Sequence, residues 1–313
     1  AGAARSRARG LIQANAILQG SSDSGSINIG GSYTNNGTYT DQGAGVVFDG
    51  TTTGKTISGN LTGSSAFGSL VFNGSGGEWT SDVSMETTYL TMTTGTLTGT
   101  GDITISSSVI GTAGVINRTG GTFTVRPSSN QNFGSTYNSK TWTFYNLTFS
   151  NSSGSPITIT RQNCTSCFIG VTNLLSIGQA GDAAATVLNG GNSSWSLTGT
   201  VATPFVLLAS PAASFTPATS DVSYNGVNPD GNVNVTTTTY SRLGCSPTSA
   251  ETCDVLESIS VSGLMTIGAN GTLAIASGKT LTHTGATLTL TGTISGAGTL
   301  EYQSATAFPA TGT

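Results

Sequence analysis

The sequence is poor in charged residues, in strong helix formers and in histidine, and each scarcity narrows the choice of fold and function. Charged residues make up 8% of its 313 positions, against roughly 25% in ordinary globular domains. Lysine, glutamate, glutamine and arginine favour helices, yet they are scarce here, and no long stretch places apolar residues at helical spacing. We therefore expect a chain with almost no helix.

Two kinds of partner are also disfavoured by what is missing. Arg5, Arg7 and Arg9 lie in the first ten positions, and the remaining basic residues form no stripe that would neutralise phosphates, so we expect no nucleic acid partner. No apolar run reaches the roughly 18 residues typical of a membrane-spanning helix, so we expect no membrane span. Because the first residue is Ala1 rather than Met, we interpret the chain as a processed or excerpted product.

What the sequence does contain is a short apolar run that ends in an aromatic residue and a turn, and this unit recurs. One copy ends at Phe48, a second ends 24 positions later at Phe72, and a third ends at Phe149. The step from Phe72 to Phe149 is 77 positions (149 minus 72), a little over three further periods of 24. Asp, Asn or Ser follows each aromatic residue and favours a tight turn. A strand-and-turn unit at a fixed period predicts a β-solenoid, whose coils stack to bury a shared core.

The regular parts of the chain alternate Thr with aliphatic residues and are interrupted by Gly, as in residues 44–125 and again near residue 290. This alternation places the aliphatic side chains inside, the threonines outside and the glycines at corners. We therefore predict an all-β fold, a parallel β-helix-like solenoid over residues 21–161 and 258–313. Residues 162–257 lose the alternation, so we expect either an irregular insertion or a loop-rich β region of the array there.

Two features of this organisation leave alternatives open. A boundary between two domains near residues 200–220 is the alternative to an insertion. In residues 31–40, Tyr33 and Tyr39 lie on either side of Asn36-Gly37. A strand, Asn-Gly and a second strand form a strong hairpin signal, but in a solenoid the same pattern would form a corner between two faces of one coil.

Residues 1–20 form an N-terminal segment in which a basic tail precedes an apolar strand. Ile12, Ala14, Ala16 and Leu18 would lie on one side of an extended strand, and residues 20–25 would tether it to the body. One interpretation is the first strand of the fold, and the other is a donor strand that completes the sheet of a neighbouring copy. The candidate donor-strand residues are Leu11, Ile12, Ala14, Ala16, Ile17 and Leu18.

The cysteines are Cys164, Cys167, Cys245 and Cys253, and four cysteines allow three connectivities. We prefer the two local disulfides, Cys164 with Cys167 and Cys245 with Cys253, which fit an oxidising compartment outside the cell. A zinc site is disfavoured because the spacing is wrong for a zinc knuckle. Redox catalysis is disfavoured because the Cys-x-x-Cys segment lacks the βαβ context of a thioredoxin motif.

Residues that would carry catalysis are few and scattered. His283 is the only histidine, and we expect it to be an ordinary strand residue. Glu78 and Asp82 flank Trp79 in an arrangement that would suit a sugar. However, no arginine or lysine base of the kind that a β-helix lyase needs is evident nearby. We therefore expect a protein that is not an enzyme.

Two binding sites are suggested by local pattern. Asn228, Asp230, Asn232 and Asn234 carry oxygens at every second position, a rhythm that calcium-binding loops often show. An ordinary Asn/Gly turn is the alternative, and we expect no other cofactor. In the less regular region, Trp195, Tyr224 and Tyr240 are candidate contacts to a glycan, although we prefer core packing for the tryptophan.

Several stretches resemble the Gly/Thr/Asn-rich repeats of large bacterial cell-surface proteins, namely the autotransporter passengers and filamentous-haemagglutinin-like adhesins. These stretches are residues 31–40, 70–74, 95–105 and 258–300. The resemblance is one of composition and rhythm, and it implies secretion, a right-handed parallel β-helix or related stack, and a structural or adhesive role. The irregular centre and the cysteines depart from it.

From these observations we expect an extracellular structural protein. It would assemble with copies of itself into a surface filament or layer through strand edges or the donor strand, because an uncapped solenoid leaves edges that pair further. A surface adhesin that binds glycans is the first alternative. A polysaccharide-degrading β-helix enzyme is the second.

Overall fold

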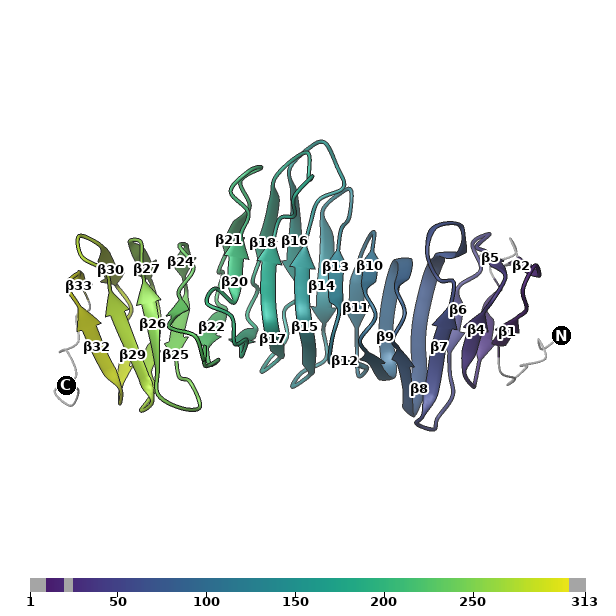
Figure 1. The fold of residues 1–313 in the computed structure, drawn as a ribbon, viewed down its shortest axis with the longest axis horizontal. Helices are drawn as coiled ribbons and strands as arrows, with labels where there is room; N and C mark the ends of the chain where they lie inside the picture. The colour runs from purple at the N-terminus through teal and green to yellow at the C-terminus, as the bar shows by residue number, and fades with distance from the viewer. Residues whose placement is uncertain (1–9, 20–24, 304–313) are drawn as a thin grey trace.

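The computed structural model describes residues 10–19 and 25–303, and this part of the chain is nearly all strand. Successive coils lie on one another with parallel strands and give a β-solenoid of about 13 turns. The coils follow one another along a rod, with β1 (Gly10–Ile12) at one end and β33 (Thr299–Tyr302) at the other (Figure 1). The predicted all-β solenoid is therefore confirmed.

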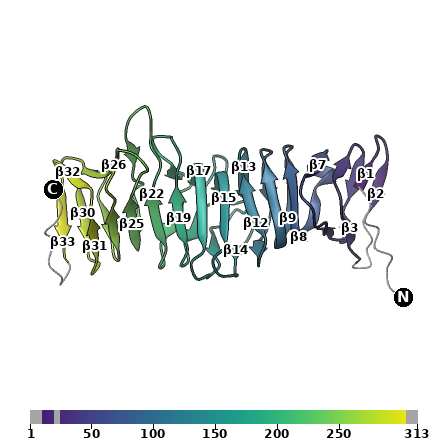
Figure 2. The same ribbon diagram turned by 90° about the horizontal axis from the view of Figure 1, so that it is seen from below.

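The described coils have three faces, which the chain visits in a fixed order, and Figure 2 shows the strands following one another along the rod. Face 1 is paired without interruption from end to end. Its strands are β1, β4 (Tyr33–Asn35), β7 (Lys55–Gly59), β12 (Val115–Arg118), β19 (Ser194–Leu197), β22 (Asp221–Tyr224), β25 (Arg242–Cys245), β28 (Met265–Ile267) and β31 (Leu288–Leu290). Longer strands turn corners and serve more than one face, namely β8 (Phe67–Ser81), β9 (Met85–Gly99), β15 (Thr141–Phe149) and β17 (Phe168–Ile177).

Faces 2 and 3 follow face 1 in each coil and close the coil around the core. Face 2 holds β2 (Ile17–Gln19), β5 (Thr38–Thr40), the 3-10 turn η1 (Gly63–Ser65), β10 (Ile103–Ile105), β13 (Thr122–Val125), β20 (Phe205–Leu207), β23 (Val233–Asn234), β26 (Glu251–Val255), β29 (Gly271–Ile275) and β32 (Thr293–Gly296). Face 3 holds β3 (Ile27–Ile29), β6 (Val46–Phe48), β11 (Val109–Gly111), β14 (Gln131–Ser135), β16 (Ile157–Arg161), β18 (Thr186–Asn189), β21 (Ser214–Thr216), β24 (Thr239–Tyr240), β27 (Ile259–Val261), β30 (Thr280–His283) and β33.

The period of 24 holds where it was first observed but not along the whole chain. Phe48 pairs in register with Phe72, as predicted. Phe149 does not continue that column, because it lies on face 2, where it pairs with Val125 and Ile177. Coil length varies, so a fixed period loses register. The step between paired residues is 19 from Leu90 to Val109 but 30 from Leu175 to Phe205.

The core is a continuous column of inward side chains that runs along the rod. Alternation explains it, because every second residue of a strand points inward, as in the buried-intermediate-buried pattern of β10. Aromatic rings stack between successive coils, for example Phe48 on Phe72 with ring centroids 5.2 Å apart. Outward positions hold mostly Thr, Ser and Asn, as the alternation predicts.

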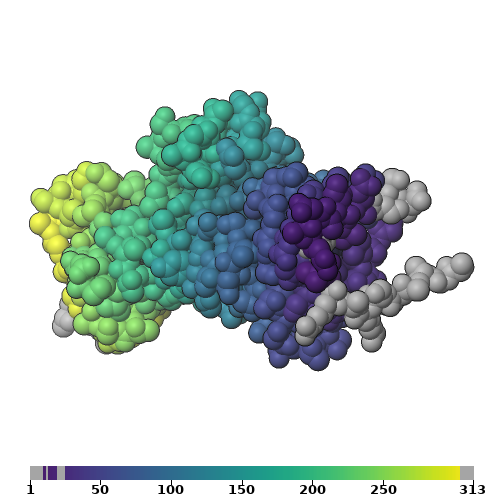
Figure 3. Space-filling model, turned by 45° about the vertical axis from the view of Figure 1, so that its right-hand side comes forward, coloured from purple at the N-terminus to yellow at the C-terminus, as the bar shows by residue number. Residues whose placement is uncertain are grey.

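Residues 162–257 belong to the stack rather than hanging from it. β16, β18 and β21 continue face 3 through this segment, and β17, β19, β22 and β25 continue face 1. What looked irregular in the sequence is the length of the corners. In Figures 1 and 3 the coils around β13–β21 project beyond the rest of the rod.

The alternative of a boundary near residues 200–220 has a counterpart slightly later in the chain. Between β20 and β23 on face 2, and between β21 and β24 on face 3, strand pairing is interrupted, whereas β22 and β25 pair directly on face 1. We call this interruption the seam. Face 2 retains a backbone hydrogen bond there, from the Asn234 N–H to the Ala202 carbonyl oxygen at 2.6 Å.

The Asn-Gly segment at residues 36–37 forms a corner and not a hairpin. β4 pairs with β7 on face 1, whereas β5 pairs with β2 on face 2, so the two strands do not pair with each other. The Asn35 side chain is buried and closes the corner, since its oxygen accepts the Gly37 N–H at 3.0 Å and its nitrogen donates to the Asn60 carbonyl at 2.7 Å.

Candidate functional site

The candidate donor-strand residues form the first described coil of the chain's own stack. Leu11 and Ile12 lie in β1, which pairs in parallel with β4, and Ile17 and Leu18 lie in β2, which pairs with β5. Ala14 and Ala16 lie between these two strands. The prediction of one extended strand is wrong, because the chain turns at Asn15, whose φ of 64° is left-handed. The tail before residue 10 and most of the tether lie outside the described residues.

The first coil leaves backbone groups directed away from the stack. The Gly10 N–H donates to the Ser32 carbonyl at 3.0 Å, and the Thr38 N–H donates to the Ala16 carbonyl at 2.9 Å. Neighbouring residues of a strand direct their backbone groups to opposite sides. The N–H and C=O of Leu11 and Ile17 therefore face outward, and the side chains of these residues are 58% and 67% exposed.

The last coil presents the complementary edge. The Thr299 N–H donates to the Lys279 carbonyl and the Gln303 N–H to the His283 carbonyl, both at 2.9 Å, so the backbone groups of Leu300 point away from β30. Leu300 and Ile294 pack against the core but are only partly buried, whereas their neighbours one coil inward are fully buried. Leu18 and Ile27 are in the same partly buried position at the other end.

The two ends match each other in strand order. The last coil visits faces 1, 2 and 3 as β31, β32 and β33, and the first coil visits them as β1, β2 and β3. Within the described residues, each of these six strands pairs on one side, with the coil next to it. Sequence reasoning identified the apolar character of both ends but missed this match, which depends on coil registers far apart in the chain.

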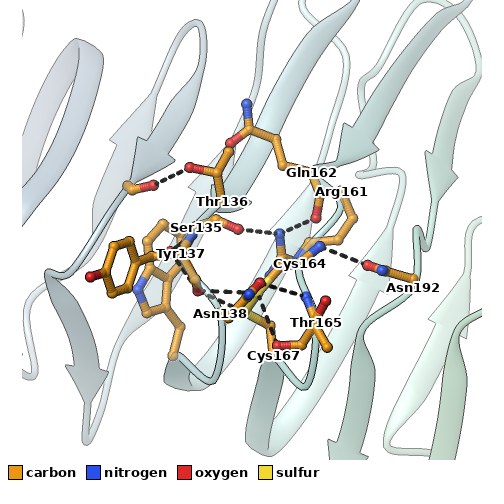
Figure 4. Close-up of a disulfide and its surroundings, with 12 residues drawn as sticks. Ser135, Thr136, Tyr137, Asn138, Arg161, Gln162, Cys164, Thr165, Cys167 and Asn192 are labelled. Carbon is orange, nitrogen blue, oxygen red and sulfur yellow. Dashed lines mark hydrogen bonds between the residues drawn. A yellow bond between two sulfur atoms is a disulfide. The ribbon is translucent and has the colours of Figure 1, made fainter.

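The cysteines form the two local pairs that the sequence favours. Cys164 bonds to Cys167 and Cys245 bonds to Cys253. Figure 4 shows the first pair, at the corner between β16 and β17. The Cys164 N–H donates to the Asn192 side-chain oxygen at 2.8 Å, and the Thr165 N–H donates to that of Asn138 at 3.0 Å. The disulfide therefore holds a corner that is also tied to the coils before and after it.

The guanidinium of Arg161 lies beside this corner, inside the solenoid. Its Nη1 donates to the carbonyl oxygens of Ser135 at 3.0 Å and Gln162 at 2.6 Å. Arg118 is buried in the same manner, with Nη2 donating to the carbonyls of Ser81 and Gly101. Burial lowers the pKa of each arginine to about 10. These cations are bound by backbone carbonyls and stabilise corners, so they are not available to a substrate.

The four candidate calcium ligands lie in and after the loop between β22 and β23, and the amide nitrogens of the three asparagines are engaged. The Asn228 Nδ2 donates to the Asn232 carbonyl at 3.0 Å, and the Asn232 Nδ2 donates to Asp254 Oδ2 at 2.8 Å. The Asn234 Nδ2 donates to Thr203 Oγ1 at 3.1 Å, and the Asp230 N–H caps the Asn228 side-chain oxygen at 3.2 Å. These contacts are those of an Asx-type turn.

The aromatic glycan candidates are core residues. Trp195, Tyr224 and Tyr240 are each 1% exposed, so none of them presents a ring to a ligand. The tyrosine hydroxyls lie 3.0 Å apart at the seam, where Tyr240 donates to the Thr236 carbonyl at 2.6 Å and Tyr224 accepts the Thr236 N–H at 2.9 Å. Burial raises the pKa of both tyrosines.

His283 is also buried, which agrees with its expected place in a strand. Its Nε2 lies 2.7 Å from the Gly263 carbonyl oxygen, and its ring stacks on Tyr302 of the last coil with centroids 5.3 Å apart. Over residues 10–19 and 25–303, no three acidic, histidine or cysteine side chains converge as metal ligands would.

Comparison of the chain with models of known protein families, with curated proteins and with solved structures finds no match. In the described part of the chain, no helix has the length and apolar character needed to cross a lipid bilayer. Function must therefore be argued from the geometry of the rod itself.

Proposed function

We propose that the chain is an extracellular structural protein whose copies join end to end, the last coil of one against the first coil of the next. Placing β1 of a second copy on β31, β2 on β32 and β3 on β33 continues all three faces in the chain's own strand order. The match in strand order at the two ends is the observation that carries this proposal.

Burial supplies the driving force for such a joint. The partly buried Leu18 and Ile27 of one copy would cover the partly buried Ile294 and Leu300 of the other, as successive coils do inside the rod. Apolar burial contributes about 25 cal/mol per Å². The outward backbone groups of Leu11 and Ile17 would gain ladder partners. Head-to-tail contact that does not close produces a filament.

Two further observations support an extracellular structural role. Disulfides persist in oxidising compartments, and this chain holds two, each inside a corner of the stack. The outer faces carry rows of Thr, Ser and Asn with few charges, which suits a passive surface. A resemblance to the repeats of bacterial surface proteins agrees with this proposal.

The joint is tested by blocking its backbone groups. The double variant Leu11→Pro/Ile17→Pro removes two outward N–H groups and no hydrogen bond of the chain's own ladder. We expect the wild type to form filaments in negative-stain electron microscopy and sedimentation, and the proline variant to stay monomeric with an unchanged circular dichroism spectrum.

The matched control is Leu11→Ala/Ile17→Ala, which shortens the same side chains but keeps both N–H groups. It should still polymerise, at a higher protein concentration. A proline variant that forms the same filaments, or a wild type that stays monomeric at every concentration, would contradict the proposal.

A further inference from the structure

A trough on face 1 lies away from both ends of the rod and is independent of the proposed joints. It has a volume of about 580 Å³ and lies over the coils of β8, β9, β12 and β15. The side chains that shape it are those of Glu78, Thr96, Val115, Asn117, Lys140 and Thr143.

Strand register explains why the surface is hollow here. Phe72 pairs with Met92 and Glu78 with Thr96 across the corner from face 3 to face 1. This corner therefore spans six residue positions in the coil of β8 (72 to 78) but four in the coil of β9 (92 to 96). The coil of β12 again takes four, since Met92 pairs with Gly111 and Thr96 with Val115.

The opposite wall arises in the same way. Gly111 pairs with Ser135 and Asn117 with Thr143, which are six steps in the coil of β12 but eight in the coil of β15. Two short corners thus lie between two corners that are each two residues longer. The longer corners carry Glu78 on one wall and Lys140 on the other.

The walls carry opposite charges that do not neutralise each other. Glu78 and Thr141 are three strands apart on face 1, a distance of about 14 Å. The ion pairs of the described residues are Arg126 with Asp182 and Lys279 with Glu257, so neither Glu78 nor Lys140 is in one. The Lys140 ammonium instead lies 5.6 Å from the centre of the Tyr137 ring, whose side chain is 57% exposed.

The floor between the walls mixes hydrogen-bonding and apolar groups. Thr96 and Thr143 contribute hydroxyls, Asn117 contributes an amide, and Val115 contributes an apolar surface, all at outward positions of face 1. A hydroxyl both donates and accepts, and an amide offers both kinds of group. The trough is therefore equipped for a ligand with many hydroxyls and an apolar ring face.

We propose that this trough binds a neutral oligosaccharide. Sugar hydroxyls donate to the Glu78 carboxylate and accept from the Lys140 ammonium at the same time, whereas a ligand of one charge sign is attracted by one wall and repelled by the other. Val115 contacts the C–H face of a pyranose. An added peptide strand is excluded, because β12 already pairs with β9 and β15 on its two edges.

Calorimetric titration with neutral tetrasaccharides tests this inference, with cellotetraose, chitotetraose, maltotetraose and mannotetraose as probes and tetragalacturonate as the charged comparison. We expect at least one neutral probe to bind more tightly than tetragalacturonate. Glu78→Ala and Lys140→Ala should each weaken its binding about tenfold, the equivalent of one charge-assisted hydrogen bond.

Filling the trough provides the sharper test. Thr96→Tyr should abolish binding, whereas Thr104→Tyr should leave it unchanged, because Thr104 holds an equivalent outward, half-buried position on face 2. Failure of all four neutral probes to bind, tighter binding of tetragalacturonate, or binding that survives Thr96→Tyr would overturn the inference. If Thr96→Tyr does not fold, unchanged affinity in Lys140→Ala overturns it equally.

Discussion

The central coils and the C-terminal coils follow the same strand order but enclose different interiors. Between β13 and β22 the paired residues are far apart in the chain, 30 positions in the case of Leu175 and Phe205, and the core is rich in aromatic rings. Between β23 and β33 the step shortens, to 20 from Cys253 to Leu273, and aliphatic side chains dominate. The longer central coils therefore hold larger inward side chains than the shorter C-terminal coils do.

The longer central coils also bury polar side chains at their corners. Asp182 is 7% exposed at the projecting corners, where it accepts from the Ser150 hydroxyl at 2.7 Å and the Gln179 N–H at 2.9 Å. Asn151 is fully buried and donates to the carbonyls of Ala184 and Ala185. Long corners carry many backbone groups, and these side chains provide their partners.

The largest expected effect is the loss of stability when one core side chain is removed from the central coils or from the C-terminal coils. Trp142→Ala should lower the free energy of unfolding by about 4 kcal/mol, and Leu281→Ala by about 3 kcal/mol. Trp142 packs edge-to-face on Phe133, and its indole N–H donates to the Gly114 carbonyl at 3.0 Å. Because coils contact mainly their neighbours, hydrogen exchange should accelerate around β12–β19 in Trp142→Ala and around β27–β33 in Leu281→Ala. Uniform acceleration along the whole rod would contradict this.

Removing a disulfide should cost less stability than removing a core side chain, and the two regions can be compared because each holds one disulfide. Their sequence separations are 3 for Cys164–Cys167 and 8 for Cys245–Cys253. Loop-closure entropy predicts losses of about 1.6 and about 2.5 kcal/mol on removing them. Thermal unfolding of Cys164→Ala/Cys167→Ala and Cys245→Ala/Cys253→Ala measures both. A larger loss for the central pair would show that corner packing, and not chain entropy, governs their contribution.

The last expected effect is absent at neutral pH and concerns the seam between the two regions. In the unfolded chain tyrosine ionises near pH 10, whereas burial keeps Tyr224 and Tyr240 protonated in the fold. Their contribution to stability is therefore complete below pH 10 and falls above it, by about 1.4 kcal/mol per tyrosine and pH unit. The variant Tyr224→Phe/Tyr240→Phe should flatten the alkaline decline in urea unfolding. An equal alkaline loss of stability in the wild type and the variant would show that ionisable groups other than these two tyrosines cause it.

Much of the fold was predictable because alternation survives wherever strands do. Thr-aliphatic alternation gave the all-β solenoid, and Phe48 and Phe72 gave one correct register. The position of Phe149 was not predictable, because corners vary in length while the strands do not. A fixed period of 24 therefore cannot tell on which face a distant residue lies. Long corners also explain why residues 162–257 look like an insertion in the sequence, since this segment has more loop residues than strand residues.

The candidate sites were less predictable because they depend on register between distant segments. Leu11 and Ile17 were identified from their apolar character, but the turn at Asn15 was not. Core packing is the preferred interpretation of Trp195 and is confirmed, whereas the sequence offers no sign that Tyr224 and Tyr240 also point into the core. Nothing local to Glu78 or Lys140 indicates that two short corners separate them.

The seam has a mechanical consequence. A pull along the rod is shared by three ladders of hydrogen bonds in most coils, but between β22 and β25 it falls mainly on face 1. Under tension, the rod should yield there first and divide into two segments that each keep their coils. Such a weak point would let the rod lengthen under load while the coils on either side of it stay folded.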